Sequence, residues 1–497
     1  MAKEKFDAIV VGAGTGGATA ARFLAKSGFK VALVEGKPRE KIGQKVCGDA
    51  VGAEVFEVLG VAEPKGDEVT WHVKGAKLYS PDRLTCVTMV DPTQAGFLLD
   101  RLEFGQRLLN EALDAGDVTL LDYCNVTGVT FAKGDGAEAK GTTPELAPRL
   151  AGVVVKDKDR RETRELSAEV VVDASGYHPA VRKRLPPSDL VELAVDDGED
   201  AIICFREVVE LVEGRARDVD YISIYLDPAN VPGGYVWYFP KGERSVNLGL
   251  GVFPSLKRSL RALYQKHAKG SFLAGQKIRV KASGGGIVSV RRPLTTLVLG
   301  NVLLVGDAGC QVNPLHGGGI DPSMRGGWMA AKAVANAHDA GNASSEEALW
   351  GYNVEFQRGV GSQFAALDVL RLALQDFTPD KLNFGLSRGL LSGEEILEVA
   401  STGGVKLDPL GLLGKALKGI TKPDLLLDLG YVHGKMGEAK KLFQRYPSSP
   451  AGLPAWKKRV EGLFSGVRRT LGKNRGKYVR RSAPAGRAKR GPVFYMF

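Results

Sequence analysis

The 497-residue sequence predicts a mixed α/β (α+β) fold: a nucleotide-binding domain, an antiparallel sheet and a helical C-terminal region. Three observations support it. Apolar runs at residues 7–11 and 30–34 flank a helix-forming stretch over 18–27, which is typical of a βαβ unit with buried parallel strands. Residues 201–253 alternate in polarity and carry many aromatics, which favours antiparallel strands. From about residue 321 the pattern becomes helical.

These patterns divide the chain into four parts. We expect a discontinuous nucleotide-binding domain over 1–190 and 285–340, and an antiparallel substrate domain over 191–284. A helical region over 341–456 and a basic tail over 457–497 follow. Inside the first domain, an apolar stripe predicts a helix over 100–115, and buried strands are expected near 170–172 and 302–305.

The charge of the chain is concentrated at its end. Lys and Arg number 68 against 57 Asp and Glu, which gives +11, and residues 457–490 hold 13 of the basic residues with a single acid. The rest of the chain is therefore near neutral. The tail is either a solvated extension or a contact for anionic lipid, and it lacks the aromatic interleaving that nucleic-acid binding would favour. A leucine-rich segment at 405–428 is either a lipid-facing amphipathic stretch or an ordinary packed helix.

Other compositional features exclude several classes of protein. The five cysteines form no CxxC pair, so we expect no metal site and no iron–sulfur electron carrier. The first residues lack the apolar core of a signal peptide, and no apolar run is long enough to span a bilayer. We expect a cytoplasmic monomer, which could also lie peripherally at a membrane surface.

A glycine motif follows the first strand. Gly12, Gly14 and Gly17 form G-x-G-x-x-G, in which the first glycine permits the turn, the second admits a pyrophosphate and the third packs helix on strand. The next strand ends at Glu35, where a ribose acceptor is required. This context predicts a dinucleotide site.

Two more elements specify which dinucleotide. A buried strand runs into Gly306-Asp307, with Asn313-Pro-Leu-His-Gly-Gly-Gly-Ile320 and a helix after it, and Asp173-Ala-Ser-Gly176 ends another strand. Residues 5–340 thereby resemble the FAD-dependent family of aromatic-ring hydroxylases, flavin halogenases and geranylgeranyl reductases. The resemblance implies a Rossmann-like FAD-binding domain. It assigns cofactor contacts to Gly12, Ala13, Gly14, Gly16, Gly17, Glu35, Cys47, Gly48, Arg101, Val126, Asp307, Gly318, Gly319 and Ile320.

Two motifs narrow the family. Lys45-Val-Cys-Gly-Asp-Ala50 follows the ribose-binding acid, and residues 232–240 match P-x-x-Y-x-W-x-F-P at every fixed position. Together they resemble the archaeal-type geranylgeranyl reductases. The resemblance implies saturation of isolated double bonds in geranylgeranyl chains of isoprenoid ether lipids or their precursors. Tyr235, Trp237, Phe239 and Pro240 would then bind substrate, because alternate strand residues place the three aromatics on one wall of an apolar tunnel.

The chemistry that this resemblance implies needs a hydride from reduced FAD and a proton. Cys47 is the candidate proton donor or gate, and His316 is a second candidate donor or relay. Cys47 and Cys310 border the cofactor from two motifs, so a disulfide between them is expected if their Cα atoms lie within about 7 Å. The reductant is external: a ferredoxin, a deazaflavin or a nicotinamide.

Three alternatives stay open. A flavin monooxygenase would use oxygen on an apolar substrate. A halogenase has a related tryptophan motif, but Tyr235 stands where that motif begins. The third alternative is a non-catalytic flavoprotein or a prenyl-group escort protein. An escort protein need not bind FAD, and the intact glycine motif with Asp307 argues against it.

Overall fold

The computed structural model describes residues 3–90, 96–132, 146–256, 258–342, 344–404 and 421–471. Its first domain is built on a six-stranded sheet of order β19-β20-β13-β2-β3-β9, parallel except for the β19–β20 pair. The βαβ unit is confirmed, since helix α1 links two strands whose residues are all buried. The strands and helix are β2 (Ala8–Val11), α1 (Thr15–Lys26), β3 (Val31–Val34), β9 (Val118–Leu121), β13 (Val170–Asp173), β19 (Val298–Leu299) and β20 (Val302–Leu304).

Helices and smaller sheets cover this parallel sheet. Helix α1 packs against α3 (Arg101–Leu113) and α6 (Ile320–Asp339), so the helices predicted near 100–115 and after 321 are confirmed. Asp100 caps α3 by accepting from the Leu102 and Glu103 amides. A four-stranded sheet joins β1 (Lys3–Lys5), β12 (Thr163–Ser167), β11 (Leu150–Asp157) and β10 (Cys124–Phe131). A three-stranded sheet joins β4 (Ala50–Gly52), β8 (Gly96–Leu99) and β5 (Val69–Val73), near the short helix α2 (Glu54–Leu59).

The predicted substrate domain is a seven-stranded sheet that departs from the prediction in three ways: one strand pair is parallel, an edge hairpin joins it, and its last strand is longer. Its order is β18-β14-β17-β16-β15-β6-β7, and the β15–β6 pair is parallel. Residues 75–90, which we assigned to the cofactor domain, supply the edge hairpin, and the last strand runs to residue 289, beyond the predicted boundary at 284. The elements are β6 (Gly75–Tyr79), β7 (Cys86–Val90), β14 (Ala201–Leu211), β15 (Tyr221–Tyr225), β16 (Val236–Pro240), β17 (Ser245–Val252), β18 (Ile278–Ser289), α4 (Leu260–Leu263) and α5 (Gly270–Phe272).

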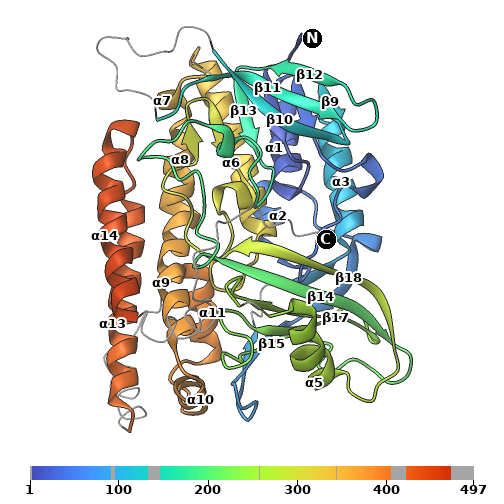
Figure 1. Cartoon of the computed structure of the whole chain (residues 1–497), viewed down its shortest axis with the longest axis vertical. Coiled ribbons are helices and arrows are strands. Elements are labelled where there is room, and N and C mark those ends of the chain that lie inside the picture. The colour runs from blue at the N-terminus through green and yellow to red at the C-terminus, as the bar shows by residue number, and fades with distance from the viewer. Residues whose placement is uncertain are drawn as a thin grey trace, which may run out of the picture.

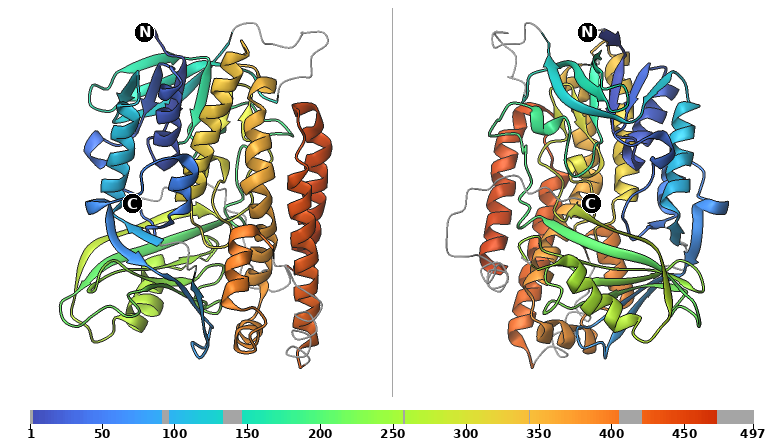
Figure 2. Two further views of the ribbon diagram at one scale, coloured as in Figure 1. Left: turned by 180° about the vertical axis from the view of Figure 1, so that it is seen from behind. Right: turned by 45° about the vertical axis from the view of Figure 1, so that its right-hand side comes forward.

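The C-terminal helices run along one side of both sheets. Figure 1 shows the parallel sheet in the upper half of the molecule, the seven-stranded sheet in the lower half, and α9, α13 and α14 along the left side. Figure 2 shows from behind that these helices flank both halves. They are α7 (Glu346–Leu349), α8 (Gly351–Phe356), α9 (Ser362–Asp376), α10 (Pro379–Ser387), α11 (Gly393–Thr402), α13 (Pro423–Gln444) and α14 (Leu453–Leu471).

The predicted basic tail begins as a packed helix, so its boundary at residue 457 was wrong. Helix α14 buries Trp456, Val460 and Phe464 against the body, because its apolar residues recur at helical spacing beneath the basic ones. Arg468 pairs with Asp200 at 2.7 Å. Residues 472–497, and 405–420 of the leucine-rich segment, lie outside the described residues. None of the described helices is long and apolar enough to cross a bilayer.

Candidate functional site

The glycine motif has the geometry that a pyrophosphate site requires. Gly12 has a φ of +100°, and a Cβ there would lie 2.4 Å from the carbonyl oxygen of Ala174. A Cβ at Gly17 would lie 1.8 Å from the carbonyl oxygen of Gly12, so this glycine lets α1 approach the turn. At Gly14, by contrast, nothing described lies within 4 Å of that position. Backbone at Gly14 and the first turn of α1, which carries no side-chain cap, is therefore open to a phosphate.

Charged groups surround this turn. The Glu35 carboxylate accepts from the Ala13 amide at 2.8 Å and from the Lys37 amide at 2.9 Å. Burial lowers the pKa of Lys37, while the nearby Glu35 opposes the shift and Lys45 and Arg101 add to it. The Nε of Arg101 is buried without a partner among the described residues. An open glycine backbone, unpaired guanidinium nitrogen and converging cations fit the diphosphate and ribose of FAD.

The second cofactor segment lies opposite the glycine turn. After β20, Gly306 takes a φ of +66°. The Asp307 carboxylate forms an ion pair with Lys45, whose Nζ lies 2.9 Å from Oδ2. Gly319 caps the start of α6 with no side-chain hydrogen bond, which leaves amide groups toward the loop. Ile320 is buried as the first residue of α6. These placements suit the predicted cofactor contacts, which stay predictions.

Other predicted cofactor residues have packing roles. Val126 is 8% exposed, on β10, within the hydrophobic core of the first domain. A Cβ at Gly16 would lie 2.8 Å from a methyl group of Val305, so this glycine lets α1 approach the segment after β20. A Cβ at Gly48 would lie 2.8 Å from the ring of Phe239.

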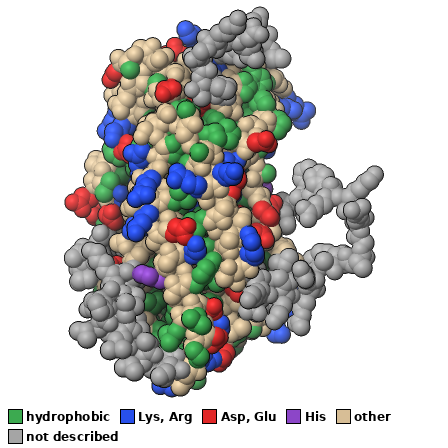
Figure 3. All heavy atoms as spheres, turned by 90° about the vertical axis from the view of Figure 1, so that its left-hand side faces the viewer, with side chains coloured by type: hydrophobic (Ala, Val, Ile, Leu, Met, Phe, Trp, Pro, Cys, Tyr) green, Lys and Arg blue, Asp and Glu red, His purple; other side chains and the backbone are tan. Residues whose placement is uncertain are grey.

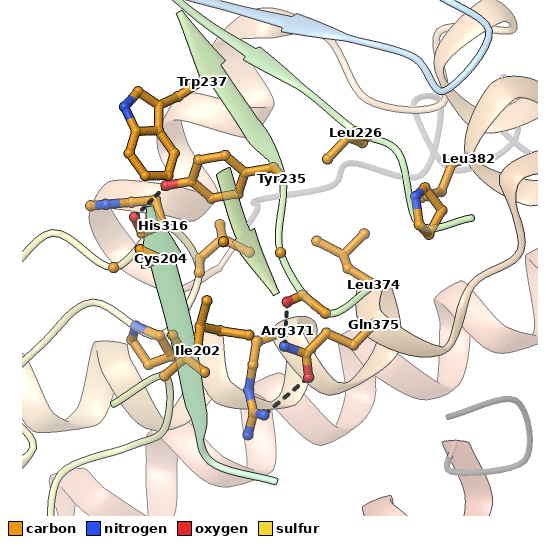
Figure 4. Close-up of a pocket in the computed structure, with 18 residues that line it drawn as sticks. Ile202, Cys204, Leu226, Tyr235, Trp237, His316, Arg371, Leu374, Gln375 and Leu382 are labelled. Atoms are coloured by element: carbon orange, nitrogen blue, oxygen red, sulfur yellow. Dashed lines mark hydrogen bonds between the residues drawn. The ribbon is translucent and has the colours of Figure 1, made fainter. Parts of the chain in front are cut away.

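A largely apolar pocket of about 120 Å³ opens where the substrate sheet, the loop at 314–317 and the helices α9 and α10 meet. In Figure 4, Tyr235, Trp237 and His316 lie on one side of it, and Leu374 and Leu382 lie on the opposite side. Two of its polar side chains are engaged: the Gln375 amide donates to the Gly233 carbonyl at 2.8 Å, and Arg371 donates to Gln375 at 3.1 Å. The pocket therefore offers mainly hydrophobic contact.

The aromatic motif is only partly in this pocket. Tyr235 and Trp237 line it with ring centroids 6.2 Å apart, and the Tyr235 hydroxyl donates to the His316 carbonyl at 2.7 Å. Phe239 is 7% exposed, contacts Gly48 instead and is not among the lining residues. Pro240 ends the buried strand β16. The substrate roles of all four residues stay predictions.

A buried polar network connects the two motifs that suggested the family. Lys241, 9% exposed, pairs at 2.8 Å with Asp49, 3% exposed, and donates to the Leu99 carbonyl. The Asn247 amide donates to the Cys47 carbonyl at 2.8 Å and to Asp49 at 3.1 Å, while the Trp237 indole donates to Asn247 at 3.0 Å. Asp49 takes a φ of +68°. The network holds the loop that carries Cys47 against β16 and β17.

The sequence interpretation assigned no role to Asn247 or to the Asp49–Lys241 pair. The available signal was the acid Asp49 inside the first motif and Lys241 directly after the second. It missed also the pocket residues Arg371, Leu374, Gln375 and Leu382, which no linear motif connects to the glycine turn.

The predicted disulfide is not formed, since Cys47 and Cys310 are both free. Cys310 is fully buried in the core of the first domain, whereas Cys47 is tied through its carbonyl to Asn247 of the substrate sheet. Burial, with a contribution from nearby Cys47, raises the pKa of Cys204 to about 12, so Cys204 is a neutral thiol in the pocket wall.

His316 is accessible from the pocket, yet the protein around its ring lowers its pKa to about 4 by desolvation. Its Nδ1 accepts from the Gly318 amide at 3.1 Å, which places the proton of the neutral ring on Nε2. A neutral imidazole is a weak acid, so this environment does not favour His316 as the proton donor.

Comparisons with known proteins agree with this geometry. Residues 200–288 match a geranylgeranyl reductase catalytic domain, and residues 7–64 match the glucose inhibited division protein A family. The chain is 34% identical over 476 residues to the digeranylgeranylglycerophospholipid reductase of Sulfolobus acidocaldarius, covering 95% of this chain and 100% of the relative. It is 31% identical to the reductase of that name from Methanothrix thermoacetophila, over 72% and 85% of the two chains.

Solved structures show the same fold. A geranylgeranyl bacteriochlorophyll reductase-like protein of Thermoplasma acidophilum aligns with a TM-score of 0.69 at 22% identity, over 87% of this chain and 100% of that one. A myxobacterial FAD-dependent halogenase aligns with a TM-score of 0.58 at 18% identity, over 84% and 97%. The predicted fold class and FAD cofactor are confirmed. The chain belongs to the digeranylgeranylglycerophospholipid reductase family.

Proposed function

We propose that this protein is an FAD-dependent reductase that saturates isolated double bonds in the geranylgeranyl chains of isoprenoid ether lipids or their precursors. The observation that carries the proposal is the apolar pocket bounded by Tyr235, Trp237 and His316 on one side and by Leu374 and Leu382 on the other. Its relatives' names and the matching catalytic domain support the same activity.

The pocket suits the substrate physically. A prenyl chain offers no charge and no hydrogen bond along its length, so binding relies on about 0.8 kcal/mol for each buried CH₂. A volume of about 120 Å³ is below the usual range for a whole ligand, so it accommodates the reacting segment of a C20 chain. Apolar walls also exclude water from the reacting carbons.

Saturation adds one hydride and one proton across the double bond. Reduced FAD, when bound, supplies the hydride. We assign the proton to the Cys47 thiol, because its loop is fixed by Asn247 and Asp49 beside the aromatic wall. Proton transfer to one alkene carbon breaks the S–H bond and leaves a thiolate, which regains a proton from solvent. His316 acts as a positioning residue, since its carbonyl holds the Tyr235 hydroxyl.

A direct test uses dithionite-reduced protein, a geranylgeranyl lipid and mass spectrometry under anaerobic conditions. We expect products heavier by multiples of two mass units. Products heavier by one oxygen, formed only with oxygen and a nicotinamide, would instead support the monooxygenase alternative. A colourless purified protein would contradict both.

The electron donor and the membrane contact belong to the same proposal. An external ferredoxin, deazaflavin or nicotinamide would reduce the cofactor. Figure 3, which faces the side of α13 and α14, shows Lys and Arg side chains gathered across the middle of that surface. Exposed cations on these helices are Lys441, Lys458, Arg459 and Arg469, and the exposed Arg445 directly follows α13. They support peripheral contact of a cytoplasmic monomer with anionic lipid, where each adds about 1 kcal/mol.

A further inference from the structure

Arg206 is a buried cation that forms no hydrogen bond or ion pair with any described residue. It lies on β14 and is 9% exposed, and its Nε and Nη1 atoms are buried without a partner. Four other arginines are buried, and each is engaged: Arg182 donates to the Glu192 carbonyl, while Arg291, Arg292 and Arg371 pair with Glu192, Asp368 and Asp200. Arg206 is the exception among them.

An unpaired, buried guanidinium lowers the stability of the folded protein. A buried charge without a partner destabilises a fold, and arginine, unlike lysine, stays charged because it does not lose its proton. A methionine of similar length at the same place would avoid the penalty. The cost of keeping the guanidinium indicates that it has a ligand in the working protein.

The position of Arg206 relates it to the pocket. Cys204, two residues earlier on the same face of β14, lines the pocket. The strand partners of Arg206 are Gly249 and Gly284, both without side chains. A Cβ at Gly249 would lie 2.2 Å from the Trp237 ring and 2.7 Å from the Arg206 Cβ. Arg206 is therefore next to Trp237, at the edge of the pocket wall.

The loop that carries Cys47, residues 45–50, covers the other side of this position. A Cβ at Gly284 would lie 2.6 Å from a methyl group of Val46, which precedes Cys47. The acid of that loop, Asp49, is already paired with Lys241 and hydrogen-bonded by Asn247, although its Oδ1 is free among the described residues. Lys241 and Asp49 cancel, so the guanidinium leaves a net positive charge at the junction of sheet and loop.

We propose that Arg206 binds an anionic phosphate group of the substrate at the edge of the apolar pocket. The planar guanidinium matches two phosphate oxygens, and its Nε and Nη1 atoms have no hydrogen-bond partner among the described residues. A prenyl phospholipid and a free prenyl diphosphate both present this chemistry. This inference rests on the proposed function, because it takes the prenyl chain to fill the pocket beside Arg206.

The test compares FAD-loaded wild-type protein with the variants Arg206→Met and Arg206→Lys, and with Arg217→Met as a control at an exposed arginine on the same domain. In thermal unfolding without ligand, we expect the melting temperature of Arg206→Met to be higher than that of wild type. Millimolar inorganic pyrophosphate should raise the melting temperature of wild type and of Arg217→Met but leave Arg206→Met unchanged.

Steady-state kinetics supply the second readout. In Arg206→Met, we expect kcat/KM for geranylgeranyl diphosphate to fall about 10- to 100-fold more than kcat/KM for geranylgeraniol. The loss should come from a higher KM. Arg206→Lys should restore part of kcat/KM for the diphosphate. A competition measurement distinguishes the two sources of phosphate. Displacement of pyrophosphate by glycerol phosphate would indicate a phospholipid, and no displacement would indicate a prenyl diphosphate. A lower melting temperature of Arg206→Met with equal losses on both substrates would show a structural or flavin-directed role and overturn the proposal. If wild type reduces neither substrate, the proposed function fails, while the pyrophosphate shift still decides whether Arg206 binds the anion.

Discussion

The cofactor half and the substrate half of this protein are built on different principles. In the cofactor half, the proposed FAD contacts are mainly backbone with a few charges: the glycine turn, the first turn of α1 and Glu35, which lie close together in sequence. In the substrate half, the proposed contacts are side chains from β14, β16, the loop at 314–317, α9 and α10, which are far apart in the chain. Backbone geometry leaves a sequence motif, whereas an apolar wall can be assembled from any large side chains. Four experiments test this difference.

The largest effect is expected at the glycine turn. Replacing Gly17 by Ala forces a Cβ against the Gly12 carbonyl oxygen, so the turn must open and both folding and FAD retention should be lost. The matched variant Gly14→Ala meets no described atom and should fold normally while its affinity for FAD falls. Yield, flavin absorbance and circular dichroism measure the two outcomes. Similar behaviour of both variants would show that the turn is not organised by backbone contact.

The second effect concerns the pair that connects the halves. Changing Lys241 to Met leaves the Asp49 carboxylate buried without its cation, and the free energy of unfolding should fall by about 3–5 kcal/mol. The double variant Lys241→Met/Asp49→Leu removes both charges and should regain part of that loss. Urea denaturation gives both values. If the double variant is as unstable as the two single losses added together, the pair is not coupled.

The third effect is kinetic. If Cys47 supplies the proton, Cys47→Ala should lower the rate of saturation by about 10²-fold or more under a fixed excess of reductant, because general acid catalysis contributes about 10²–10⁴-fold. Cys204→Ala is the control at a nearby thiol in the pocket wall: burial raises the pKa of Cys204 to about 12, which makes it a poor acid, so we expect little change in kcat. Unchanged turnover by Cys47→Ala would remove this residue from the mechanism.

The smallest effect is the pH dependence that His316 contributes. Its pKa is about 4 in the folded protein against 6.5 ordinarily, so between these values the unfolded chain binds the proton more readily. The contribution of the neutral His316 ring to the free energy of unfolding is therefore fully present above pH 6.5. It is lost as the pH falls toward 4. Relative to His316→Asn, wild type should lose stability over that window in calorimetry. Parallel curves for the two proteins would contradict the lowered pKa.

The comparison explains which inferences from sequence succeeded. The βαβ unit and the buried strand before Gly306 were predictable, because each depends on neighbours within a few residues. The ribose contact of Glu35 stays a prediction. The edge hairpin at 75–90 was assigned to the wrong domain, because strand pairing with β15 joins segments about 140 residues apart and leaves no local signal. The disulfide was wrong for a related reason: two motifs that border one cofactor need not face each other.

By itself, the sequence determined the nucleotide-binding topology, the cofactor class and the family, since glycine spacing and the aromatic motif are constraints on consecutive residues. Only the tertiary structure decided that Phe239 supports the Cys47 loop while Tyr235 and Trp237 face the pocket. It also decided that Asn247 holds Cys47 and that Arg206 is left without a partner. Burial and pairing depend on which distant segments cover a side chain, and that is a property of the packed fold.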